Sequence, residues 1–160
     1  MIRIERIISG GQTGADQAAL DVAIDHGIAH GGWVPKGRRT EGGPLPGKYR
    51  MKEMPTDSYP KRTEQNVMDS DGTLIISHGE LREGSDFTRR MAVKHGKPWI
   101  HIDADKQSID AAVEIIRTWM SSNEIEILNV AGPPASKDPR IYTTTKRILE
   151  AVLLSTYEDS

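Results

Sequence analysis

The stretch IISGGQTGAD, residues 7–16, decides the fold predicted for this chain. It ends an apolar run over residues 2–8, which predicts a buried strand, and two glycines follow directly. A helical pattern with small residues on one side begins at Thr13 or Gly14 and runs to about His26. Residues 2–26 therefore predict a strand, a tight turn and the amino end of a helix.

Such a turn favours an anion, because the first N–H groups of a helix lack partners and the helix dipole is positive there. Phosphate is the anion most often bound in this way. The pattern resembles G-x-G-x-x-G with serine first, but it lacks the lysine of a Walker loop. We expect a phosphate-binding loop made of Ser9, Gly10, Gly11, Gln12, Thr13, Gly14 and Asp16.

The remaining chain alternates predicted strands with predicted helices. Further strands are expected at residues 31–35, 73–77, 99–102 and 125–130, and helices at 62–69, 86–95, 109–120 and 141–153. This alternation predicts an α/β fold: a single Rossmann-like three-layer domain over residues 1–160, with about five mainly parallel strands and helices on both faces. We favour the strand order 2-1-3-4-5. Residues 36–60 are rich in proline and glycine, and we expect a long irregular segment there.

Composition excludes several classes of protein. The 160 residues suit one domain, and a net charge of −2 argues against a nucleic-acid partner. The absence of cysteine excludes disulfides, thiolate metal sites and cysteine nucleophiles. No apolar run approaches the roughly 20 residues that span a bilayer, and the first residues do not read as a signal peptide. We therefore expect a cytoplasmic protein without a membrane partner.

A basic stretch follows the second predicted strand. Lys36, Arg38 and Arg39 stand where a dinucleotide site would place an acidic residue for a ribose hydroxyl. Arginine can bind phosphate oxygens with two hydrogen bonds, and Trp33 offers a ring for stacking. These residues argue against NAD and favour a second negatively charged group, although a solvated basic loop is the alternative interpretation.

A second glycine-bearing corner follows the third predicted strand. Gly84 and Ser85 are expected to open a helix, with Thr88 one turn later, so this corner is a second candidate anion site. A simple helix cap by Ser85 and Asp86 is the alternative explanation.

Four further residues face the same predicted edge of the sheet. Arg62 and Asn66 lie one helical turn apart and are expected to point together into the cleft. Asn129 is an unusual residue for a buried strand, and Gly132 follows it. These four residues complete the candidate binding site. The alternative interpretations are that Arg62 and Asn66 are a surface pair and that Asn129 hydrogen-bonds neighbouring backbone groups.

Catalytic chemistry finds little support in the residue pattern. Asp16, Glu80 and Glu83 are the acids nearest the predicted cleft, and no serine–histidine–acid set is evident. His78 ends a strand and could reach the cleft, whereas His95 and His101 suit structural roles. No metal-ligand spacing occurs. The catalytic residues are therefore unassigned and no metal site is expected.

Several of these runs resemble a known family. Residues 9–16, 31–38, 69–75, 96–98 and 128–133 resemble the putative molybdenum carrier family, also described as circularly permuted YpsA-like. That family shares a Rossmann-like superfamily with the lysine-decarboxylase-like (LOG) proteins and the molybdenum cofactor carrier proteins. The resemblance covers about residues 7–154.

The resemblance implies a homo-oligomer that binds molybdenum cofactor (molybdopterin) or a nucleotide. The leading hypothesis is a carrier of such a phosphorylated small molecule, with molybdoenzymes as recipients of the cofactor. LOG enzymes use a Gly-Gly-x-Gly-Thr-x-x-Glu motif, whereas residues 84–90 lack the paired glycines and place arginine near the glutamate position. This departure disfavours the rival hypothesis of a nucleotide N-glycosidase or phosphate-ester hydrolase. A nucleotide-sensing module is the third hypothesis.

Overall fold

The sheet at the centre of the molecule is wholly parallel. The computed structural model describes residues 2–158, so residues 1, 159 and 160 of the predicted domain lie outside the described residues. In spatial order the strands are β2 (Ala29–Gly31), β1 (Arg6–Ile8), β9 (Ile127–Ala131), β7 (Gly72–Ser77) and β8 (Trp99–Asp103). β1 is shorter than the predicted run over residues 2–8.

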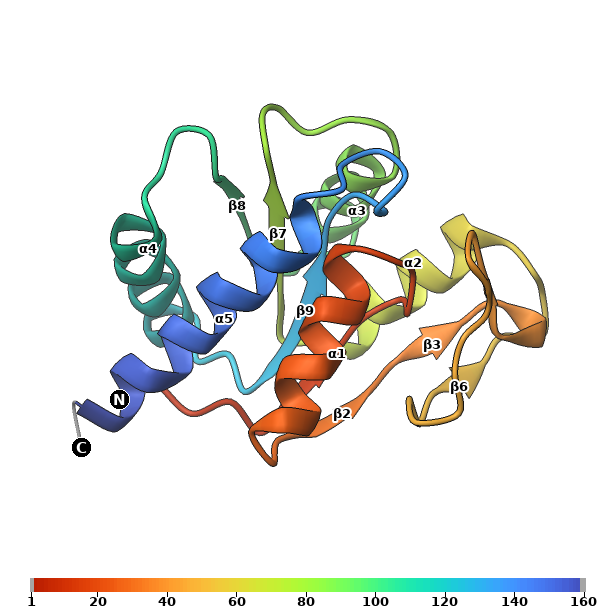
Figure 1. Cartoon of the computed structure of the whole chain (residues 1–160), viewed down its shortest axis with the longest axis horizontal. Helices are drawn as coiled ribbons and strands as arrows, with labels where there is room; N and C mark the ends of the chain where they lie inside the picture. Colours follow the sequence, from red (N-terminus) through yellow and green to blue (C-terminus); the bar gives the residue numbers. More distant parts are fainter. Residues whose placement is uncertain (1, 159–160) are drawn as a thin grey trace.

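Helices cover both faces of this sheet (Figure 1). One face carries α1 (Ala15–Asp25), α4 (Ile109–Ser122) and α5 (Ile141–Glu158). The other carries α2 (Tyr59–Asp69) and α3 (Glu83–Lys94). This arrangement confirms the predicted Rossmann-like three-layer α/β fold. Within residues 2–158, no helix has the length and hydrophobicity needed to cross a membrane.

The predicted strand order is wrong in one respect. The last strand, β9, does not lie at the edge but between β1 and β7, where Asn129 is paired with Ile8 on one side and Thr73 on the other. Leu128 and Val130 are fully buried, which suits a strand covered on both faces. The alternation of strands and helices along the sequence does not determine where the last strand lies in the sheet, nor how many strands each connection passes. Counted from β9, the observed order becomes 3-2-1-4-5.

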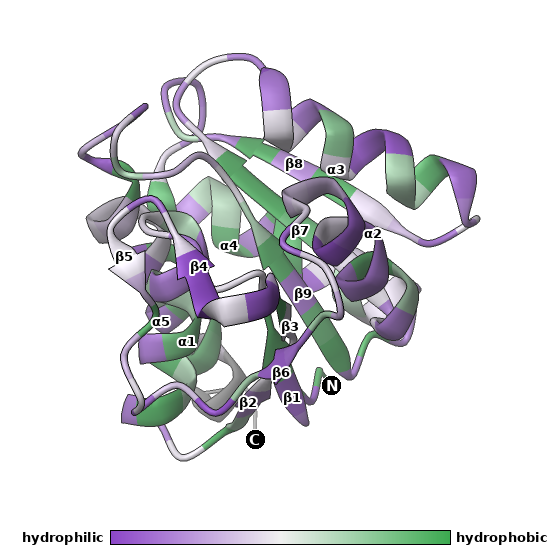
Figure 2. Cartoon of the chain, turned by 90° about the vertical axis from the view of Figure 1, so that its right-hand side faces the viewer, coloured by the Kyte–Doolittle hydropathy of each residue, from purple (hydrophilic) through white to green (hydrophobic). Residues whose placement is uncertain are grey.

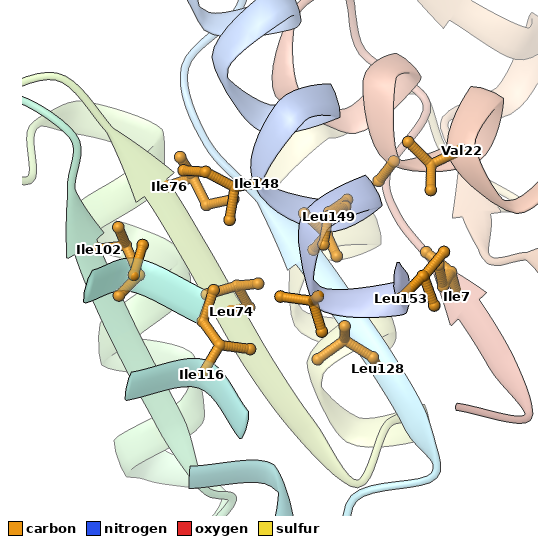
Figure 3. Packing of buried hydrophobic residues seen from close by; sticks show 14 of the residues in the cluster. Ile7, Val22, Leu74, Ile76, Ile102, Ile116, Leu128, Ile148, Leu149 and Leu153 are labelled. Atoms are coloured by element: carbon orange, nitrogen blue, oxygen red, sulfur yellow. The ribbon is translucent and has the colours of Figure 1, made fainter. Parts of the chain in front are cut away.

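The main core lies between the sheet and the face that carries α1, α4 and α5 (Figure 3). Leu74 and Leu128 of the central strands meet Ile116 of α4 and Ile148 and Leu149 of α5. All residues of β7 are buried, and this strand is green along the middle of Figure 2. Burial of this apolar surface drives the packing, which holds the carboxyl ends of the strands in place.

The segment over residues 36–60 is folded through short pairings, not irregular throughout as predicted. A 3-10 turn (Lys36–Arg38) leads into the hairpin of β4 (Arg39–Thr40) and β5 (Gly43–Pro44), and β6 (Lys52–Glu53) pairs with β3 (Trp33–Val34). A small second core of Leu20, Val34, Leu45 and Tyr49 anchors the segment to α1. Strands of two residues carry no periodicity, which explains why the pattern was not visible in the sequence.

Two helices begin earlier than their periodicity predicts. α2 begins at Tyr59, where the hydroxyl of Ser58, not of Thr63, accepts a hydrogen bond from the Lys61 amide. α3 begins at Glu83 and not at Asp86. The hydroxyl of Ser108 caps α4, because it accepts a hydrogen bond from the Ala111 amide at 3.1 Å.

Candidate functional site

A cleft of about 1070 Å³ lies beyond the carboxyl ends of β1, β7 and β9. Ligands of open parallel sheets bind at this edge, where the strand order changes direction. The loops after these strands, α2, the start of α3 and the tip of the β4–β5 hairpin form its walls. The predicted site residues that line it are Gly10, Gln12, Asp16, Arg62, Asn66, Gly84, Ser85, Thr88, Asn129 and Gly132.

The other predicted site residues do not line the cleft. They are Ser9, Gly11, Thr13, Gly14, Trp33, Lys36, Arg38 and Arg39. Most of them build the surrounding loops instead, as the contacts below show.

The amides of the first loop are largely taken up by the protein itself. The Gly11 amide donates to the Ser9 hydroxyl at 3.3 Å, and the Gln12 amide donates to the Asp16 carboxylate at 3.2 Å. The Thr13 amide donates to the side-chain oxygen of Gln12 at 3.0 Å. The prediction that these three amides are left free for a phosphate is therefore wrong. The carboxylate of Asp16 occupies the place inside the turn that an anion was expected to fill.

Gly14 has a packing role in the same turn. The residue has a φ of 85°, and a Cβ there would lie 2.6 Å from the Pro133 carbonyl oxygen and 2.9 Å from the Ala135 nitrogen. The following amide, of Ala15, donates to that Pro133 carbonyl at 3.4 Å. Gly14 therefore lets the loop after β9 lie directly against the start of α1.

Arg62 brings a buried positive charge to the cleft. Its side chain is only 10% exposed, and its Nη1 contacts Oδ2 of Asp16 at 3.4 Å. Its Nε has no hydrogen-bond partner. A Cβ on Gly10 would collide with the guanidinium, so the glycine allows Arg62 to lie flat against the loop backbone. A buried guanidinium with an unused donor is a binding group for an anion.

Burial dominates the ionisation of Asp16. It raises the pKa of this carboxyl from 3.8 to about 6, against the opposing effects of the Arg62 charge and of hydrogen bonds from Gln12, Arg62 and Gly10. The contact with Arg62 is single and long, so its attraction does not offset the loss of hydration.

This shift predicts a pH-dependent stability. The folded protein holds the Asp16 proton to a higher pH than the unfolded chain does. Its contribution is therefore complete below about pH 4 and is lost as the pH rises through about 6. The limiting loss in free energy of unfolding is roughly 3 kcal/mol. Urea denaturation should show Asp16→Asn gaining stability relative to the wild type between pH 4 and pH 7.5.

Asp21 supplies a matched control of opposite sign. Its pKa is lowered because hydrogen bonds from Tyr142 and Tyr49 and the charge of Lys48 outweigh partial burial. Asp21→Asn should therefore lose stability relative to the wild type as the pH rises toward 3.8, the ordinary pKa of an aspartate. A stability difference between wild type and Asp16→Asn that stays constant from pH 4 to pH 7.5 would contradict the assignment.

The second candidate anion site lies at the start of α3, and this helix begins earlier than predicted. α3 begins at Glu83, which has a φ of 47°, and no side chain caps the helix at Arg82. The alternative explanation, a helix cap by Ser85 and Asp86, is not what the structure shows, because Ser85 lies within the first turn and is buried. Thr88 donates back to the Gly84 carbonyl at 2.9 Å. An uncapped helix start thus faces the cleft and favours a negative charge.

The two asparagines are used mainly within the protein. Asn66 accepts from the Trp33 amide at 2.7 Å and donates to the Trp33 carbonyl at 3.0 Å, which ties α2 to β3. The Trp33 ring donates to Asp69 at 2.7 Å and does not line the cleft. Asn129 donates to the Thr73 hydroxyl at 3.1 Å across neighbouring strands. Both asparagines therefore support the cleft wall.

The basic stretch does not converge on the cleft. Lys36 is exposed, and the exposed Arg39 lies over the Tyr59 ring at 4.6 Å without lining the cleft. Arg38 closes the segment that follows it: its guanidinium donates to the backbone carbonyls of Leu45, Pro46 and Tyr49. In this structure Arg38 stabilises a loop, and Arg39 belongs to the outer surface.

Aromatic and charged residues that sequence reasoning missed complete the cleft. Tyr59 begins α2 and Phe87 lies in α3, and both line the cleft. Arg90 also lines it and lies over the Phe87 ring at 5.5 Å. No pattern in the sequence marked these three residues as cleft residues.

The hairpin tip closes one side of the cleft. Glu41 accepts hydrogen bonds from the Thr13 hydroxyl and from the backbone and hydroxyl of Ser136. These hydrogen bonds lower the pKa of the Glu41 carboxyl. Thr13 thus joins three loops and is not an anion ligand here.

His78 lines the cleft, as predicted. Its Nδ1 lies 2.5 Å from the Asp138 carboxylate, and its Nε2 lies 3.0 Å from the Thr144 hydroxyl.

Comparisons with known proteins agree with this architecture. The chain matches the model of the Circularly permutated YpsA SLOG family over residues 7–153. A crystal structure of a protein from Syntrophus aciditrophicus SB, named a putative molybdenum carrier protein, is 58% identical with a TM-score of 0.93. The similarity covers 94% of this chain and 95% of that one. No curated protein matches the chain.

The sheet itself displays the permutation that the family description states. With β9 and α5 counted first, the strand order is 3-2-1-4-5, the order of a doubly wound nucleotide-binding sheet. In this chain β9 and α5 come last in the sequence, and β9 still lies at the centre of the sheet. The chain therefore belongs to the Circularly permutated YpsA SLOG family.

Proposed function

We propose that this protein binds and carries a small phosphorylated ligand in the cleft, with the phosphate between Arg62 and the amino end of α3. The observation that carries the proposal is the buried Arg62 guanidinium, which lines the cleft and whose Nε has no hydrogen-bond partner. The start of α3, which no side chain caps, adds a second positive end beside the same cleft. Both groups suit a phosphate, and Arg62 has only the single contact with Asp16.

Molybdenum cofactor or a nucleotide is the ligand we expect. The carrier name of the 58% identical protein supports the former. Tyr59 and Phe87 line the same cleft and suit the flat ring of a pterin or a base. Within residues 2–158 no group of histidine and acidic side chains could hold a metal, so a molybdenum atom would remain on the dithiolene of its own cofactor.

The residues of the cleft favour binding over turnover. His78 is engaged at both ring nitrogens by Asp138 and Thr144. Glu83 is exposed and lies 3.7 Å from the Lys137 ammonium. Asp16 is buried beneath the first loop. None of these three groups is placed as a free acid or base toward the centre of the cleft.

Native mass spectrometry of the protein as purified, followed by calorimetry, tests the proposal. Molybdopterin, a panel of nucleoside monophosphates and inorganic phosphate should each be titrated, and the solutions analysed for released base or phosphate. We expect heat and a thermal shift without product release. Absence of binding by every phosphorylated compound would refute the carrier proposal, and released base would favour the hydrolase.

Light scattering of the same samples tests the proposed homo-oligomer. Molybdoenzymes remain the recipients we expect for a bound cofactor. A change of assembly on addition of nucleotide alone would favour the sensing module over the carrier.

A further inference from the structure

The Asp16 carboxylate is the group with which Arg62 is paired inside the protein, and both residues line the cleft. Oδ2 of Asp16 contacts Nη1 of Arg62 at 3.4 Å, through one contact and not through the paired hydrogen bonds that a carboxylate can make with arginine. The Nε of Arg62 is left without a partner. Arg62 is therefore only partly neutralised from within the protein, and an oxyanion from the cleft can offer it a better partner.

We propose that Asp16 is an internal competitor for the anion site, and that an oxyanion binding to Arg62 displaces its carboxylate and makes it take up one proton. This inference rests on the proposed function, since it concerns the same cleft. It gives the carrier a means of release: when Asp16 loses the proton again, its carboxylate returns to Arg62 and the anion leaves.

The surroundings of Asp16 explain why the displaced carboxylate gains a proton. Its side chain is 7% exposed, and the Gln12 amide holds Oδ2 at 3.2 Å, so the group cannot turn into water. Two negative groups beside one buried guanidinium repel each other strongly. Burial already raises the pKa of Asp16 to about 6, and a neighbouring anion raises it further.

Other charged groups reach the cleft from each wall. They are Glu41 from the hairpin, His78 and Glu80 from the loop after β7, Arg82 and Glu83 from the start of α3, Arg90 from later in α3, Asp105 from the loop after β8, and Lys137 and Asp138 from the loop after β9. Within residues 2–158, Arg62 is the cation in an ion pair with Asp16. Several of the others are paired among themselves, as His78 is with Asp138 and Lys137 with Glu83.

Calorimetric titration with inorganic sulfate tests the inference, because sulfate keeps the same charge from pH 5.5 to pH 8. Measurements in two buffers of different ionisation enthalpy report the number of protons taken up. We expect uptake approaching one proton per sulfate at pH 7.5. Above the pKa of Asp16 the Kd should rise by about tenfold per pH unit.

Two variants assign the proton. Asp16→Asn keeps an oxygen that can accept from the Gln12 amide, and it should bind sulfate without proton uptake and with nearly constant affinity. His78→Asn should retain the proton uptake of the wild type. Loss of the uptake in His78→Asn would overturn the assignment to Asp16. If Asp16→Asn does not fold, the wild-type uptake together with His78→Asn decides the question.

The possible failures are distinguishable. Sulfate that binds the wild type equally well at pH 5.5 and pH 8, without proton uptake, would overturn the competition and leave the anion site intact. Failure of sulfate and phosphate to bind at any pH would overturn the proposed anion site and this inference with it.

Discussion

Arg62→Met is expected to weaken the binding of inorganic phosphate about a hundredfold at pH 6.5. The variant removes the buried guanidinium and its unpartnered Nε while keeping an unbranched side chain of comparable length. Hydrogen bonds to a charged group contribute about 3 kcal/mol at the upper end of the usual range, which corresponds to that factor. Isothermal titration calorimetry measures the change directly.

Arg39→Met is the matched control, because Arg39 and Arg62 lie against the same Tyr59 ring. Arg39 is exposed and does not line the cleft. Its replacement should change the Kd by less than about threefold, as expected for a screened surface charge. Equal losses in the two variants would show that general positive charge, and not the buried guanidinium, attracts the anion.

The double variant Arg62→Met with Asp16→Asn guards against a folding artefact. Removal of Arg62 alone leaves the Asp16 carboxylate buried without its cation, which by itself destabilises a protein. The double variant has neither charge, and it should melt close to the wild type while still failing to bind phosphate. Phosphate binding restored in the double variant would refute the role given to Arg62.

Gly132→Ala is expected to lower the free energy of unfolding by about 3 kcal/mol. An added Cβ would collide with the Ile76 carbonyl oxygen of β7 and would lie 2.6 Å from the Cβ of Ala15. Both belong to the packed interior, so neither can move away easily. For a chain of this size the melting temperature should fall by roughly 6–12 °C, measured by calorimetry.

Gly47→Ala provides the control for this substitution. Gly47 is exposed in the segment between β5 and β6, and no atom lies within 4 Å of an added Cβ. Its melting temperature should stay within about 2 °C of the wild type, because only the entropy of the unfolded chain changes. A Gly132→Ala protein as stable as Gly47→Ala would contradict the close approach of β9 to β7 and α1.

The turn at residues 7–16 shows which features could be predicted from the sequence and which could not. Its strand, turn and helix are present as predicted, because local propensity and apolar periodicity depend on near neighbours. The free amides expected there are absent, since Asp16 turns back one helical turn to accept from Gln12. The sequence is the same whether the Asp16 carboxylate accepts hydrogen bonds from its own loop or leaves the loop amides free, so the sequence alone does not distinguish the two.

The predicted site residues likewise fall into two groups, those that line the cleft and those that are engaged elsewhere in the protein. Arg62 was predicted from its helical spacing with Asn66, and Gly84 from its place after the third predicted strand, and both line the cleft. Arg38 and Trp33 have equally suggestive chemistry, yet backbone carbonyls and Asp69 engage them. Residue type states what a side chain can bind, whereas only the neighbouring segment shows whether that capacity is already used.

The sequence by itself determined the α/β class, most of the helices and the edge of the sheet at which the cleft lies. These features follow from periodicity and from the geometry common to parallel sheets. Only the tertiary structure decided that β9 lies at the centre, that Arg62 is buried beside Asp16, and that α3 begins at Glu83. Each of these depends on contacts between residues far apart in the chain, and such contacts leave no periodic trace along it.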